Sequence, residues 1–134
     1  MTYSRKAVYT YVRNAIVASH SGAYVTARRE VIPKNFPAIH ITEMNRVRTE
    51  RFATLANDDV QYESAMQAEI FSNAQNGALE EAYSILDTVE SAFKRLGYFE
   101  TFCQPIDNVD PSVFRIVARF TRQIGMADVI PTST

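Results

Sequence analysis

The chain has 134 residues, a common length for one domain, and can bury most of its apolar surface without disulfides or metal ions. Hydrophobic residues make up 46% and charged residues 22% of it, which excludes wholesale disorder and a fibrous repeat. The formal net charge of -1 excludes a global electrostatic field that attracts nucleic acid or an anionic membrane. Any attraction of anions must therefore come from a local group of basic residues.

The first predicted element is a helix that begins after Ser4, whose side-chain oxygen can cap it. Apolar residues recur at helical spacing over residues 7–16, and Gly22 favours an end nearby. This amino-terminal segment has no continuous apolar run typical of a signal peptide or a membrane span. We therefore expect synthesis in the cytoplasm and no membrane partner.

Two short β-prone segments follow the first helix. Residues 24–28 favour a short strand, and residues 36–43 a second one. Pro33 and Pro37 bracket a turn between the two segments. Because proline donates no hydrogen bond to a neighbouring strand, the second strand must lie at a sheet edge or begin after the proline.

Periodicity fades over residues 44–58, and we expect a long loop there. This segment holds Arg46, Arg48 and Arg51 beside Phe52; arginine suits phosphate oxygens, and an aromatic ring can stack on a base. Three interpretations stay open: a solvated loop with local ion pairs, a protein interface, and a nucleic acid contact. The acids available for such ion pairs are Glu43 and Glu50.

A strongly alternating strand is predicted over residues 60–70. The face expected in the core holds Val60, Tyr62, Ser64, Met66, Ala68 and Ile70. The opposite face, which is solvated or pairs with another polar surface, holds Gln61, Glu63, Gln67 and Glu69.

The best-specified element is a helix that starts after Asn76, a capping residue, and ends at Gly97. Glu80 and Glu81 occupy its first turn, where the helix dipole favours acids. Its apolar stripe must lie across a sheet, because it would aggregate if exposed. The stripe consists of Leu79, Ala82, Tyr83, Leu86, Val89, Phe93 and Leu96.

An antiparallel strand pair closes the chain, over residues 98–104 and 113–124. Arg115 and Arg119 share one face of the last strand, with a charge opposite to that of Glu63 and Glu69, so cross-strand pairing is expected. The fold class is α+β: a mainly antiparallel sheet packed by the amino-terminal helix and the long central helix. We expect one domain over residues 1–125 and a flexible tail over residues 126–134.

Metal and catalytic motifs are not found. His20 and His40 have no metal-ligand spacing around them, and the single Cys103 lies in a predicted strand away from any His. Asp58, Asp59, Asp107 and Asp110 fit turns better than a calcium loop. The sequence contains no glycine-rich phosphate loop and no GxSxG motif. We expect no cofactor, no metal and no enzymatic activity.

Three segments of the chain resemble the tail terminator, or tail completion, proteins of long-tailed bacteriophages. They are NFPAIHITEMN at residues 35–45, SAMQAEIFSN at residues 64–73 and NGALEEAYSILDTVESAF at residues 76–93, in the same order as in the family. The resemblance spans about residues 36–124.

The resemblance implies a non-enzymatic virion protein, typically a hexameric ring at the tail-neck junction. Such a ring caps the tail tube, ends tail polymerisation and meets the head-neck connector protein. A contact with DNA passing through the lumen stays open. Candidate subunit or partner contacts are Arg46, Arg48, Arg51, Asp58, Asp59, Glu63, Glu69, Arg115 and Arg119.

Two alternatives stay open beside the tail terminator. A head closure or neck adaptor protein uses similar small subunits. A small ligand-binding domain would instead place a cavity between helix and sheet, lined by Tyr83, Tyr98 and a polar partner.

Overall fold

The computed structural model describes residues 3–28, 33–49, 61–108, 110–125 and 128–131. The elements follow in the order α1 (Arg5–Ser19), β1 (Tyr24–Thr26), β2 (Ala38–Thr49), β3 (Gln61–Ser72), α2 (Ala78–Arg95), β4 (Phe99–Pro105) and β5 (Phe114–Gly125). The strands form one sheet in the order β1-β2-β3-β5-β4, and only the β1–β2 pair is parallel. The fold is therefore α+β, as the sequence predicted.

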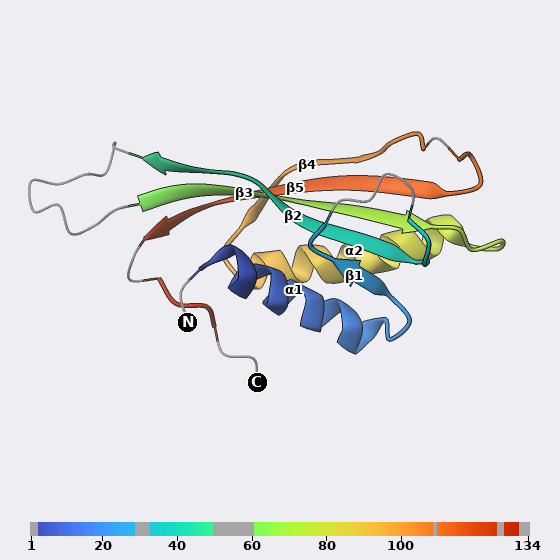
Figure 1. Cartoon of the computed structure of the whole chain (residues 1–134), viewed down its shortest axis with the longest axis horizontal. Coiled ribbons are helices and arrows are strands. Elements are labelled where there is room, and N and C mark those ends of the chain that lie inside the picture. The colour runs from blue at the N-terminus through green and yellow to red at the C-terminus, as the bar shows by residue number, and fades with distance from the viewer. Residues whose placement is uncertain (1–2, 29–32, 50–60, 109, 126–127, 132–134) are drawn as a thin grey trace, which may run out of the picture.

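Both helices lie side by side on one face of the sheet (Figure 1), which we call the helix face. We call the opposite face, on which neither described helix lies, the outer face. Ser64, Met66, Ala68 and Ile70 of β3 are buried on the helix face, so the predicted core face is confirmed for these residues. Tyr62 is half-buried, and Val60 lies outside the described residues. The main core fills the space between this face and the helices.

Helix α1 begins as predicted, with Ser4 Oγ accepting a hydrogen bond from the Ala7 backbone N–H at 3.1 Å. Val8, Val12 and Ile16 form its buried stripe. The expected end near residues 20–22 is also confirmed, because α1 stops at Ser19.

Helix α2 differs from its prediction at the amino-terminal end. The N-cap is Gly77, at φ 84°, which has no side chain to cap the helix, so the expected cap by Asn76 is wrong. Leu79 is 50% exposed, because the buried side of the helix begins only with Ala82. Ile85 is fully buried on the stripe, although the sequence pattern did not select it.

Strand β2 is longer than predicted and runs to Thr49. The loop expected from residue 44 is therefore wrong for residues 44–49, and residues 50–58 lie outside the described part of the chain. The register with β3 shifts between Glu43 and Asn45, which leaves Met44 as a β-bulge. A bulge moves the side chains that follow it to the opposite face of the sheet. The alternation of apolar and polar residues is therefore interrupted at Met44, and the sequence pattern no longer indicates a strand.

The remaining elements agree with the sequence pattern. Strands β4 and β5 pair antiparallel as expected, and β1 covers only three residues of the predicted segment 24–28. The flexibility of residues 126–134 stays a prediction. Within that tail, however, Ile130 is only 8% exposed and joins the main core.

Candidate interaction surfaces

Polar pairs join β3 to β5 on the outer face. The Arg119 Nε–H donates to Gln67 Oε1 at 3.0 Å, and its guanidinium lies 4.8 Å from the centre of the Phe102 ring. Gln123 donates to Glu63 Oε2 at 3.1 Å. These contacts hold long side chains in defined positions on a face that neither described helix covers.

One end of the outer face carries a nearly buried ion pair. Arg115 Nη2 lies 2.5 Å from Glu69 Oε2, with the two side chains 18% and 2% exposed. The charge pairing predicted between β3 and β5 is confirmed for Glu69 with Arg115, whereas Arg119 donates to Gln67 and Glu63 accepts from Gln123. The Arg115 guanidinium also lies over the Phe71 ring, and the His40 ring packs against Phe71 at 5.0 Å between centroids.

The burial of Glu69 follows from a second apolar cluster over this end of the outer face. Its members are Ala38, Phe71 and Val113, with Phe36 packed against them. Burying a carboxylate is costly unless a cation and hydrogen bonds satisfy it, which Arg115 does. The remaining length of the outer face is more open, with Glu63 exposed and Arg119 half-buried.

Arg46 is committed to contacts inside the molecule. Its Nε and Nη2 donate to Glu43 Oε2 at 3.0 and 2.9 Å, and Nη2 also donates to the Tyr3 carbonyl at 2.8 Å. The Glu43 side chain is 5% exposed, and its Oε1 also forms an ion pair with Arg5 Nε at 2.9 Å. Glu43 Oε2 accepts a hydrogen bond from the Ser64 hydroxyl at 3.0 Å. The contact with Glu43 is the local ion pair that the sequence left as one interpretation.

The other members of the predicted arginine cluster are placed differently. Arg48 is exposed on β2 near the end of the described strand. Arg51 lies outside the described residues, as do Asp58 and Asp59. Arg46 pairs in register with Ser64, so it lies on the helix face, opposite to the face of Glu63 and Arg119.

A polar network that the sequence pattern did not indicate ties the start of the chain to its last strand. The Tyr3 hydroxyl donates to the Leu96 carbonyl at 2.9 Å, and Arg122 Nη1 donates to both of these oxygens. Arg122 Nη2 also pairs with Asp128 at 3.1 Å. Burial raises the pKa of the Tyr3 phenol, against the opposing effect of the Arg122 charge.

A third feature lies where α2 meets the edge strand β4. Ligand atoms of Glu90, Glu100 and Cys103 all lie within 4.8 Å of one another. The hydrogen bond to Glu100, with burial and the Glu100 charge, raises the pKa of Glu90 to about 7. Burial and the two acids raise the pKa of the Cys103 thiol, which disfavours the thiolate that metals bind.

Comparison of the sequence with known proteins finds no matching family model and no curated protein of significant similarity. Neither described helix is long and apolar enough to cross a membrane.

Proposed function

We propose that this protein is a structural subunit that assembles with copies of itself into a ring at the tail-neck junction of a long-tailed phage. The ring caps the tail tube, ends its polymerisation and meets the head-neck connector protein. The observation that supports this best is the outer face of the sheet. It is a broad surface with fixed arginine contacts, and protein interfaces are enriched in arginine and aromatic residues.

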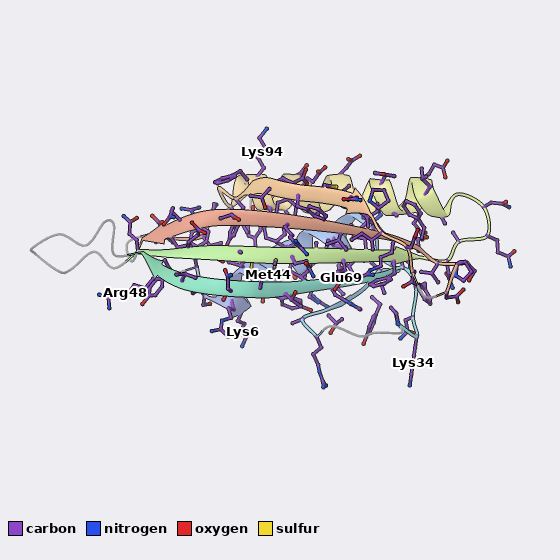
Figure 2. The ribbon with its side chains drawn as sticks, turned by 90° about the horizontal axis from the view of Figure 1, so that it is seen from above. Lys6, Lys34, Met44, Arg48, Glu69 and Lys94 are labelled. Atoms are coloured by element: carbon purple, nitrogen blue, oxygen red, sulfur yellow. The ribbon has the colours of Figure 1, made fainter. Side chains whose placement is uncertain are left out.

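The composition of the outer face favours recognition over solubility alone. Its described cations are Arg115 and Arg119, whereas Lys6, Lys34 and Lys94 extend from the margins of the molecule (Figure 2). Arg119 stacks over Phe102, and Phe99 on the same face is 63% exposed. An antiparallel sheet can leave one face in water, but an exposed aromatic beside a positioned guanidinium suits a protein partner.

The two tyrosines that the ligand-binding alternative places around a cavity are in contact with other side chains. Tyr98 is 3% exposed, packs edge-on against Phe93 and donates its hydroxyl to Ser64 at 3.0 Å. Tyr83 packs against the Phe114 ring at 6.0 Å between centroids. Both tyrosines are therefore used in packing. A head closure or neck adaptor role remains the second candidate, because the same outer face suits it.

The test is the mass of the purified protein over a range of concentration and salt, by light scattering coupled to size exclusion, followed by negative-stain imaging. We expect a ring of several copies, alone or on addition of the tail tube protein of the same virus. A strict monomer in every condition that does not bind tail tube protein would contradict the proposal.

A matched pair of charge reversals tests the outer face directly. Arg119→Glu places an acid on the outer face, and Arg13→Glu makes the same change at an exposed position of α1. We expect at least a tenfold loss of binding to tail tube or connector protein for Arg119→Glu and little change for Arg13→Glu. Equal effects of the two variants would mean that general charge, not this face, determines binding.

A further inference from the structure

We infer that copies of this chain join edge to edge, with β4 of one copy pairing along residues 41–49 of β2 in the next copy, so that the sheets continue from subunit to subunit. The inference rests on the proposed ring and names its contact. The two margins of the sheet match in four respects: open strand edges, strand direction, charge and exposed apolar side chains.

Both margins present strand edges that the described residues leave open. At one margin β4 is the last strand of the sheet, and six of its seven residues are exposed. At the other margin β1 pairs only with Ala38, Ile39 and His40, which leaves the β2 edge, residues 41–49, beyond it. Exposed edges present unpaired backbone groups that add a further strand readily.

The strand directions suit a head-to-tail contact. β2 and β5 both run antiparallel to β3, and β4 runs antiparallel to β5, so β4 and β2 point in opposite directions. A second copy placed beside the first in a similar orientation therefore brings its β4 antiparallel to β2. This is the pairing used by every neighbouring pair of strands in the sheet except β1–β2.

The two margins carry opposite charges on the helix side. Beside the β2 edge, Arg5, Lys6 and Glu43 help to line a hollow of about 520 Å³, and Arg48 is exposed further along the strand. Bases therefore outnumber the acid Glu43 at this margin. Glu100 of β4 pairs in register with Phe120 and so points to the helix side, where it lies against Glu90. An added β4 would direct Glu100 towards the hollow.

Acids also outnumber bases around Glu100. Glu90 lies against Glu100, and the Asp87 charge also acts on Glu90. Lys94 extends from the same margin, near the end of α2 (Figure 2). A two-fold contact between two β4 edges would bring these acids together, and like charges across a strand pair are unfavourable. A head-to-tail contact brings acids to bases instead, and a heterologous contact of this kind forms a ring when the rotation between neighbouring copies closes.

Exposed apolar side chains are also found at both margins. Met44 is 45% and Val47 is 53% exposed on the β2 edge, and Phe99 is 63% exposed on β4. Val47 and Phe99 both lie on the outer face, by register with Glu63 and Thr121. In a continuous sheet these side chains can therefore cover one another. Each edge strand also has one bulge, at Met44 and at Thr101, which bends it and limits pairing to a partner of matching curvature.

Cross-linking through the single native cysteine tests this contact. Cys103 is exposed on β4, so Met44→Cys adds a second thiol on the β2 edge. Within one chain the two strands are three strand spacings apart, roughly 14 Å, so a short bismaleimide cannot join them internally. We expect a ladder of trimers and larger species for the β2-edge cysteine variant, and no cross-linked species for the unchanged protein or for Ala18→Cys on α1.

Charge reversal provides a second measurement of the same contact. Lys6→Glu and Glu100→Lys should each weaken self-association at least tenfold, and the double variant should recover most of it. Arg13→Glu is the matched control on the exposed side of α1. Recovery in the double variant is the result that general loss of stability would not produce.

The outcomes separate this inference from the proposed function. Rings seen by imaging with no ladder would overturn the edge contact and leave the ring proposal standing. Cross-linked dimers through Cys103 alone would show a two-fold β4–β4 contact and would also overturn the inference. A monomer at all concentrations would contradict both.

Discussion

The two faces of the sheet are built from alternating residues of the same strands, yet different forces hold them. On the helix face, Phe93 of α2 stacks on Phe120 of β5 at 4.3 Å between centroids, and both are almost fully buried. On the outer face, Arg119 is held by Gln67 and Phe102 while it stays partly exposed. The helix face therefore buries most of the apolar side chains of the sheet, whereas the open part of the outer face holds polar side chains that stay partly exposed.

Replacing one phenylalanine on each side should give the largest difference. Phe93→Ala opens a cavity in the core, and we expect it to lower the free energy of unfolding by about 3–5 kcal/mol. Phe99→Ala removes a ring that is 63% exposed, and we expect a change within about 0.5 kcal/mol. Urea unfolding followed by circular dichroism measures both. Equal losses would mean that the outer face is part of the core.

Removing one partner of the buried ion pair should give the next largest effect. Arg115→Met leaves the Glu69 carboxylate buried without its cation, and we expect a loss of about 2–4 kcal/mol. The double variant Arg115→Met/Glu69→Leu should recover most of this loss, because neither charge remains buried. A double variant that is as unstable as the single one would show that packing, not charge, is responsible.

The acid pair beside β4 should give the smallest effect, with a defined pH dependence. The pKa of Glu90 is raised from 4.5 to about 7, so the folded state binds more protons than the unfolded state between these values. Stability therefore falls as the pH rises through this window. Glu90→Gln should make the protein more stable than the unchanged chain above pH 7, by on the order of 1 kcal/mol because solvent screens the pair. Unfolding at pH 4 and pH 8 measures it, and an equal gain at both would contradict the mechanism.

Most of the fold could be predicted from the sequence, because apolar residues recur at a regular spacing within its helices and strands. Met66, Ala68 and Ile70 alternate without interruption along β3, and the apolar stripe of α2 continues to Phe93. The end of β2 could not be predicted, because the bulge at Met44 breaks the alternation just where Arg46 and Arg48 make the segment look like a loop.

The candidate surfaces were less predictable than the fold. The pairing of Glu69 with Arg115 follows from matching charges on neighbouring strands, and the sequence indicated it. The ion pair of Arg46 with Glu43 was one of the interpretations left open by the sequence. The contact of Arg46 with the Tyr3 carbonyl did not follow, since Tyr3 is distant in the chain. The open edges could not be predicted either, because strand order is decided by the packing of the whole sheet.

The hydrogen bonds at the Leu96 carbonyl also have a consequence for how the molecule opens. Tyr3 lies just before α1, Leu96 at the end of α2 and Arg122 on β5, so one acceptor oxygen joins three separate parts of the chain. Asp128 extends this connection beyond the last strand. Fraying of either end would break the same contacts. Amide hydrogen exchange at the start of α1 and near residue 128 should therefore slow or accelerate together.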